Sequence, residues 1–335
     1  MYQRFFGLTK EPFAMTPDPA FLFMTGAHRE AFAGLCYAVL TGKGFVVLTG
    51  DAGTGKTTLL TKMLQYIQPS RATFSMVLNP MLTPDEFLEL ALLDFGIRDV
   101  PASKAQRLVL LREFLNESRK LDKISVLVVD EAHKLAPSVL EEIRLLSNFE
   151  VKDAKLLHIV MAGQNELTTV LNREDLRQLK QRISVRLRLP ALSRTDVEHY
   201  IQHRWTAAGG QTHPFSLEAM EQITRWSTGI PRLVNVLCDN ALVLAFAEGS
   251  SVVARMHVAE VASDLELSER PGMRAVAQLR VAASAKNTNG TASGKSAGGT
   301  LPTIERYMPE TSDLSRLTRF AAKLRLERDR HKQDF

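Results

Sequence analysis

Residues 50–57 read Gly-Asp-Ala-Gly-Thr-Gly-Lys-Thr, which matches the phosphate-loop pattern G-x-x-x-x-G-K-[ST]. The apolar segment Phe45–Thr49 before the loop predicts a short buried strand, and residues 57–68 after it predict a helix. The pattern requires this order of strand, loop and helix. Glycines let backbone N–H groups turn toward phosphate oxygens, and a helix N-terminus attracts negative charge. We therefore expect the chain to bind a nucleoside triphosphate.

The residue types of the loop assign individual roles. Lys56 is expected to reach the β- and γ-phosphates, and the Thr57 hydroxyl to ligate Mg²⁺. The expected nucleotide-binding residues are Gly50, Asp51, Ala52, Gly53, Thr54, Gly55, Lys56, Thr57 and Thr58.

A second motif indicates what happens to the nucleotide. Residues 126–131 read Val-Leu-Val-Val-Asp-Glu, an apolar strand that ends in two carboxylates. Asp130 is expected to hold Mg²⁺, and Glu131 to orient and deprotonate the attacking water. The alternative is a strand that ends in an ordinary acidic turn. Residues 130–133 also spell DEAH, but no other helicase motif is visible and the chain is short for two helicase domains, so we do not expect a helicase.

Composition sets the broad class of the protein. The chain has 335 residues, of which 45% are hydrophobic and 24% charged, as in ordinary soluble proteins. A formal net charge of +5 permits contact with nucleic acid or an anionic membrane surface without requiring it. Cys36 and Cys238 form neither a disulfide framework nor a zinc motif, and no signal-peptide layout or membrane-spanning apolar run is visible. We expect a cytoplasmic protein.

From residue 28 to residue 190 the sequence predicts an α/β core in which strands and helices alternate, which implies a parallel sheet with helices on both faces. The predicted strands are Phe45–Thr49, Thr73–Leu78, Val126–Asp130, Leu157–Ala162 and Ser184–Leu189. The predicted helices lie at about 28–40, 57–68, 84–95, 104–120, 137–149 and 174–182.

The remaining segments predict different structures. Residues 1–27 form an aromatic, proline-broken arm that we expect to be irregular, and residues 191–268 predict a small helical lid with helices at about 194–208, 216–227, 231–247 and 256–267. Residues 269–312 have the composition of a flexible linker. Residues 313–335 predict a basic amphipathic helix, which offers a contact for a protein, a lipid headgroup or DNA.

Two further polar residues are candidates for contact with the nucleotide. Gln164 ends an apolar strand, where it suits the γ-phosphate or the lytic water, although it could equally cap the next helix. Arg232 follows Gly229-Ile230-Pro231 at the start of a lid helix, from which it could point back toward the phosphates. Asn79 follows the second strand and either restrains Glu131 or caps the turn at Pro80.

An arginine before the last core strand could reach the nucleotide of a neighbouring subunit and stabilise transition-state charge in trans. Arg182 is the first choice for this role, ahead of Arg177 and Arg186. The alternative is an ordinary solvated or salt-bridged arginine.

Taken together, several segments resemble the ExeA/GspA-like AAA+ ATPases of bacterial secretion loci, in the form found beside exosortase and exopolysaccharide genes. The matching segments are residues 5–8, 12–13, 16–19, 44–50, 130–133, 163–164, 166–167 and 229–232. The resemblance implies an Orc/Cdc6-like AAA+ P-loop NTPase that uses ATP and Mg²⁺ and forms homo-oligomers, with the aromatic arm near the adenine. The chain departs from the family at Asn165, where proline is usual, and it lacks the transmembrane segment and peptidoglycan-binding domain of full-length ExeA.

Two function classes remain open after this resemblance. The first is an ATPase that energises or regulates assembly of an envelope secretion or polysaccharide-export system through partner proteins. The second is a DNA-associated regulator resembling the transposition ATPases TniB and TnsC, which the basic tail favours. A nucleotide-binding switch without hydrolysis is a weaker third possibility, because the Asp130-Glu131 pair is intact.

Overall fold

The computed structural model describes residues 2–15, 21–67, 71–152 and 154–267. The predicted linker 269–312 and the predicted basic helix 313–335 lie outside the described residues.

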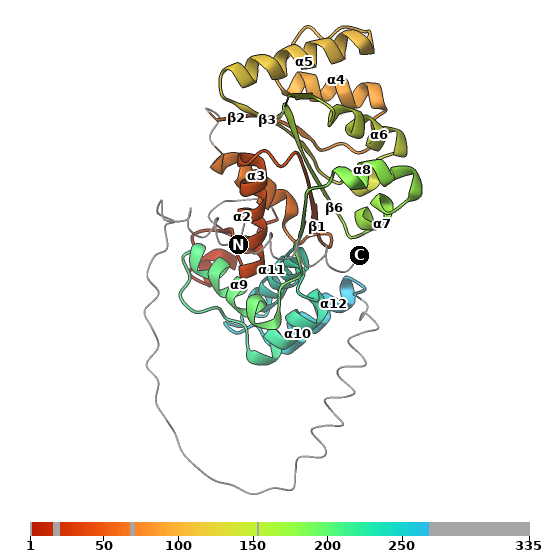
Figure 1. Ribbon diagram of the computed structural model, residues 1–335. Coiled ribbons are helices and arrows are strands. Elements are labelled where there is room, and N and C mark those ends of the chain that lie inside the picture. The colour runs from red at the N-terminus through yellow and green to blue at the C-terminus, as the bar shows by residue number, and fades with distance from the viewer. Residues whose placement is uncertain (1, 16–20, 68–70, 153, 268–335) are drawn as a thin grey trace, which may run out of the picture.

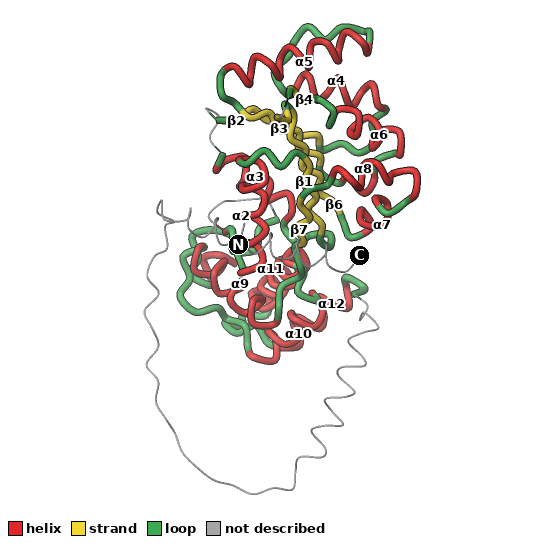
Figure 2. The backbone as a smooth tube through the Cα atoms, in the orientation of Figure 1, coloured by secondary structure: helices red, strands yellow, loops and turns green. Residues whose placement is uncertain are grey.

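A five-stranded parallel sheet forms the centre of the larger part of the molecule (Figure 2). The strand order is β2-β3-β6-β1-β7, so β1 pairs with β6 on one side and with β7 on the other. The strands are β1 (Phe45–Thr49), β2 (Ala72–Val77), β3 (Ile124–Val129), β6 (Leu157–Gly163) and β7 (Val185–Arg188). The predicted parallel sheet is confirmed, and its order places the ends of β1, β3 and β6 next to one another.

Helices cover both faces of the sheet (Figure 1). The first face packs on α2 (Gly26–Leu40) and α3 (Lys56–Tyr66). The second packs on α4 (Pro84–Asp94), α5 (Lys104–Lys120), α6 (Pro137–Leu146), α7 (Glu166–Leu171) and α8 (Arg177–Arg182). Successive side chains of a strand alternate between faces, so Val46 joins the first cluster and Val47 the second. This burial on both sides explains the continuous apolar runs of the strands.

Four helices form a second part of the molecule beyond β7: α9 (Arg194–Ala207), α10 (Leu217–Ser227), α11 (Pro231–Ala247) and α12 (Arg255–Asp264). Their apolar faces share one core with the N-terminal arm, which contributes Tyr2, Leu8, Phe13 and Phe21. The Arg204 guanidinium on α9 donates to the Pro12 carbonyl at 2.5 Å and lies 5.0 Å from the Phe21 ring centroid. The arm is therefore packed against the lid helices.

Three local expectations were wrong. The arm is not wholly irregular, because Tyr2–Phe5 forms the short helix α1, and Gly7 in the turn that follows has a φ of 70°. The predicted helix 137–149 ends at Leu146, and the following residues form a small hairpin of β4 (Glu150–Val151) and β5 (Ala154–Lys155). The predicted helix 174–182 divides into a 3₁₀ turn, Glu174–Leu176, and α8. In the second and third cases the apolar spacing fitted a longer helix, but the chain turns within the predicted range at a point that the spacing does not encode.

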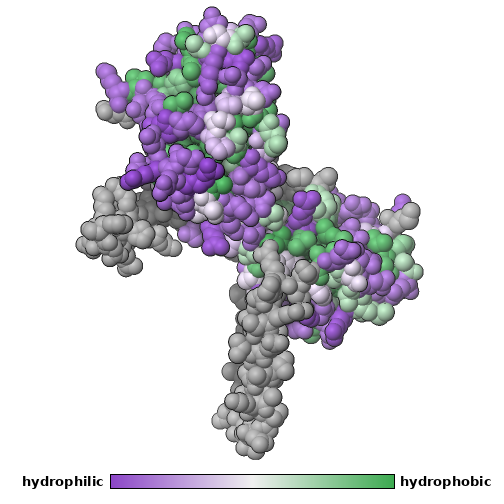
Figure 3. Space-filling model, turned by 90° about the vertical axis from the view of Figure 1, so that its right-hand side faces the viewer, coloured by the Kyte–Doolittle hydropathy of each residue, from purple (hydrophilic) through white to green (hydrophobic). Residues whose placement is uncertain are grey.

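Hydrophilic residues cover most of the sheet-containing part on the face drawn in Figure 3, and hydrophobic residues form smaller patches. Among the residues that the structure describes, no helix is both long enough and apolar enough to cross a membrane.

Candidate active site

The loop between β1 and α3 is held in shape by two neighbouring strand ends. The Gly50 N–H donates to the Gly163 carbonyl at 3.3 Å, and a Cβ added at Gly50 would lie 2.4 Å from the Leu189 carbonyl oxygen. Only glycine fits this close approach. Gly53 and Gly55 have φ values of 77° and 93°, in the left-handed region that favours glycine. The strand–loop–helix context expected of the motif is therefore present.

Lys56 lies at the start of α3 with its ammonium turned back into the loop. Its Nζ donates to the carbonyls of Gly50 and Asp51, both at 2.9 Å. Burial lowers the pKa of Lys56, opposed by the negative charges of Glu131, Asp130 and Asp51. Among the described residues no carboxylate lies within ion-pair distance of this buried cation, and a phosphate would supply the missing negative charge. Gly55, the cap residue of α3, provides no side-chain cap, so the loop and the helix start fit an anion.

A hydroxyl and a carboxylate meet beside this lysine. The Thr57 hydroxyl donates to Asp130 Oδ2 at 2.5 Å, although the two residues are 73 positions apart. Asp130 is buried directly after β3, and its other oxygen accepts the Glu131 N–H at 2.8 Å. Hydroxyl and carboxylate oxygens are ligands that suit Mg²⁺. The two residues predicted to bind the metal are therefore together, and their chemistry fits that ion.

Glu131 has a backbone conformation unusual for a non-glycine residue, with a φ of 51°. This turn directs the chain from β3 into a 3₁₀ turn, Ala132–Lys134, and leaves the carboxylate half-exposed. Glu131 Oε2 lies 3.2 Å from Lys134 Nζ and 3.8 Å from His133 Nε2. The negative charge of Glu131 also opposes the lowering of the Lys56 pKa by burial.

The end of β6 connects to both of these elements. The Gln164 N–H donates to His133 Nδ1 at 3.3 Å, and the Asn165 amide donates to Asp51 Oδ1 of the loop at 2.8 Å. The backbone of Gln164 therefore contacts the turn that carries Glu131, and a contact of its side chain with the nucleotide stays a prediction. At Asn165, where proline is expected from the resemblance, the chain instead supplies an amide that contacts the phosphate loop.

The lid reaches the same loop through the start of α11. The Arg232 N–H donates to the Gly53 carbonyl at 3.4 Å, and a Cβ added at Gly53 would lie 2.8 Å from Arg232 Cβ. Arg232 therefore sits against the phosphate loop, while its exposed side chain makes no hydrogen bond or ion pair among the described residues.

Arg182, in contrast, is away from this loop. Its Nη1 donates to the hydroxyl of Ser147, the residue after α6, at 2.7 Å. The pKa of the Glu141 carboxyl is lowered mainly by Arg144 and that of Glu150 mainly by Lys155, and the positive charge of Arg182 lowers both a little further. Arg177 and Arg186 are exposed. None of the three reaches the nucleotide loop of its own chain, so the role in trans stays a prediction.

Sequence reasoning missed His28 and gave no role to His133. His28 on α2 pairs through Nδ1 with the Thr25 hydroxyl at 2.7 Å and through Nε2 with the Thr54 carbonyl at 3.3 Å. Burial lowers the pKa of His28, so it supports the loop as a neutral ring. No sequence pattern links α2 to the loop 26 residues later.

The Asn79 side-chain oxygen accepts from the Met81 N–H at 3.0 Å, which favours the alternative that Asn79 caps the turn at Pro80.

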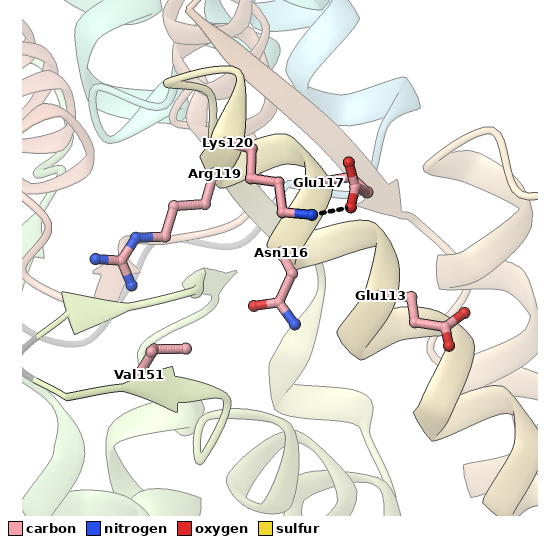
Figure 4. Close-up of a pocket in the computed structure, with 6 residues that line it drawn as sticks. All are labelled: Glu113, Asn116, Glu117, Arg119, Lys120 and Val151. Carbon is pink, nitrogen blue, oxygen red and sulfur yellow. Dashed lines mark hydrogen bonds and ion pairs between the residues drawn. The ribbon is translucent and has the colours of Figure 1, made fainter.

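A hollow of about 480 Å³ lies elsewhere, between α5 and the β4–β5 hairpin (Figure 4). It is lined by Glu113, Asn116, Glu117, Arg119, Lys120 and Val151. No predicted site residue lines it, and the Lys120–Glu117 ion pair partly neutralises its rim.

Known proteins resemble the chain in fold and sequence. The AAA domain family model matches residues 39–171. General secretion pathway protein A of Aeromonas hydrophila is 43% identical over 251 residues, covering 75% of this chain and 46% of that protein. The ATP-dependent target DNA activator B of Escherichia phage Mu is 25% identical over 248 residues, 71% of this chain and 72% of that protein.

A solved structure supports the same architecture. The ORC2 protein of Aeropyrum pernix, in ADPNP–ADP complexes, matches with a TM-score of 0.58 and 17% identity, over 76% of this chain and 71% of that one. The expected Orc/Cdc6-like AAA fold is thereby confirmed. The chain spans about half the length of the Aeromonas protein.

Proposed function

The chain is an ExeA/GspA-like AAA+ protein, and on this premise we propose that it is a Mg²⁺-dependent ATPase. The observation that carries the proposal is the Thr57–Asp130 contact of 2.5 Å beside the buried Lys56 cation, which has no carboxylate within ion-pair distance in the part of the chain that the structure describes. A hydroxyl, a carboxylate and a cation at one loop match the needs of a metal-bound triphosphate.

Bound ATP supplies the γ-phosphoryl group that is transferred to water. Lys56 would neutralise charge on the phosphates. Thr57 and Asp130 would hold Mg²⁺, which would neutralise further negative charge on the phosphate oxygens when bound. Glu131 orients the attacking water and accepts its proton at the carboxylate. Gln164, directly after β6, and Arg232 from the lid would contact the phosphate end of the nucleotide. Arg232 would thereby link the nucleotide state to the position of the lid.

We propose that a homo-oligomer of this cytoplasmic protein energises or regulates an envelope secretion or polysaccharide-export system through partner proteins. The relative named General secretion pathway protein A, 43% identical, supports this process. The predicted basic tail would supply a partner or peripheral membrane contact. The second candidate is a DNA-associated regulator, which is favoured by the 25% identical DNA activator of phage Mu and by the net charge of +5.

Two substitutions test the chemistry. Lys56→Ala should abolish ATP binding, since it removes the buried cation, whereas Glu131→Gln should bind ATP and lose turnover, because an amide keeps the shape but cannot accept a proton. Lys120→Ala and Glu113→Gln, on α5 away from the loop, are matched charge controls and should behave as wild type. Normal turnover by Glu131→Gln would remove Glu131 from the role of base.

Duplex DNA separates the two processes. An ATPase that serves secretion should be indifferent to DNA in moderate salt, and truncation at Thr300 should remove a protein or membrane partner. Strong stimulation by DNA, with binding that weakens steeply as salt rises, would favour the second candidate instead.

A further inference from the structure

His133 occupies the space between the ends of β3 and β6. It lies on the 3₁₀ turn Ala132–Lys134, and only 9% of its side chain is exposed. A Cβ added at Gly163 would lie 3.2 Å from the His133 N atom, so the turn and β6 approach each other as closely as a glycine allows. This contact fixes the imidazole relative to the sheet.

The hydrogen bonds of the ring determine which nitrogen can act on Glu131. His133 Nδ1 accepts the Gln164 N–H at 3.3 Å, which requires a free lone pair on Nδ1. In the neutral ring the proton is then on Nε2, which faces Glu131 Oε2 at 3.8 Å. A movement of the carboxylate by roughly 1 Å brings the pair to hydrogen-bond distance.

Glu131 has one other charged neighbour within ion-pair distance among the described residues, Lys134, at 3.2 Å. The Lys134 side chain is 53% exposed and its position is held by little else, so this ion pair is weak and screened. His133 is therefore the buried neighbour of Glu131, and Lys134 is the exposed one.

We propose that His133 is the positioning residue for Glu131, and that it ties the orientation of this carboxylate to the backbone of Gln164. The inference rests on the proposed ATPase function and adds a residue to it. His133 touches neither the reacting water nor the phosphates. It acts by donating from Nε2 to the Glu131 carboxylate while its Nδ1 accepts from the Gln164 N–H. A shift of the chain at the end of β6 would therefore also shift the carboxylate of Glu131.

Substitution of His133 by Gln or Asn tests the roles of Nε2 and Nδ1 separately. His133→Gln can place an N–H near the Nε2 position, and His133→Asn can place a carbonyl near the Nδ1 position without reaching Glu131. We expect kcat to fall about 10- to 100-fold in His133→Asn and His133→Ala and to be largely retained in His133→Gln, because a misplaced base slows the chemical step. Affinity for a fluorescent ATP analogue should stay unchanged in all three. Lys134→Ala, which removes the exposed neighbour, should change kcat by about twofold or less.

Coupling to Glu131 is the second readout. Glu131→Asp keeps a carboxylate but shortens its reach, so adding His133→Ala to it should lower kcat no further. Three results would each overturn the proposal. They are equal kcat values for the Asn and Gln variants, a loss of nucleotide affinity in the His133 variants as large as their loss of kcat, and additive effects on kcat in the double variant. An unchanged ATPase rate in Glu131→Gln would instead contradict the proposed role of Glu131 as the base, and the inference about His133 would fail with it.

Discussion

Gly53→Ala should disturb the contact between the phosphate loop and the lid. Gly53 has a φ of 77°, and the added Cβ would lie 2.8 Å from Arg232 Cβ and 3.1 Å from Ile230 Cγ2. The left-handed backbone alone costs a non-glycine residue about 1–2 kcal/mol. The overlap with the start of α11 adds about 1–3 kcal/mol, because either the loop or the lid must shift.

Two other glycines isolate the second contribution. Gly96 has a φ of 91° and Gly249 a φ of 69°, and an added Cβ meets no atom within 4 Å at either position. Gly96 lies in the sheet-containing part and Gly249 in the lid, so each alanine variant reports backbone strain alone.

Thermal unfolding without nucleotide measures the difference. At roughly 2 °C per kcal/mol for a chain of this size, Gly96→Ala and Gly249→Ala should lower Tm by about 2–4 °C, and Gly53→Ala by about 2–6 °C more. If Gly53→Ala loses no more than the two controls, the loop and the lid are not packed as described, and the link between nucleotide and lid through Arg232 fails.

Three further predictions concern other contacts. Burial lowers the pKa of His158 to about 4, so the folded state resists protonation of this ring. About 3 kcal/mol of the free energy of unfolding that is present above pH 6.5 should therefore be lost as the pH falls toward 4. Denaturant unfolding of His158→Gln should show a free energy of unfolding that depends less on pH across this range. Tyr2→Phe removes the 2.5 Å hydrogen bond to Asp239 and should cost about 1 kcal/mol in the same assay, whereas no change would mean that the arm is not anchored there. Mixing Arg182→Ala with Glu131→Gln subunits should restore partial ATPase activity if Arg182 acts in trans, and the absence of rescue would point to another arginine.

Much of the candidate site could be predicted because its signals are local. The loop motif fixes the residues around Lys56, since glycines and a helix start are needed within eight positions. The apolar run before Asp130 predicts a buried strand whose end carries the metal ligand. The apolar run before Gln164 predicts by the same reasoning a buried strand whose end lies near the loop. The sequence patterns could not place Arg182, because its partner Ser147 is 35 positions away in the chain and is not encoded near it.

The sequence alone therefore determined the nucleotide loop, the parallel α/β class and the helical character of the lid, because each depends on residue types and spacing within one short segment. Tertiary structure decided the strand order, which brings Thr57 to Asp130. It also decided where the N-terminal arm packs on the lid, since the Thr9 hydroxyl donates to the Ala208 carbonyl, 199 positions away. It also decided the contacts of His28 with Thr54 and of His133 with Gln164. Such contacts join residues that are distant in the chain, and only the packing of whole helices and strands brings their atoms within hydrogen-bond distance.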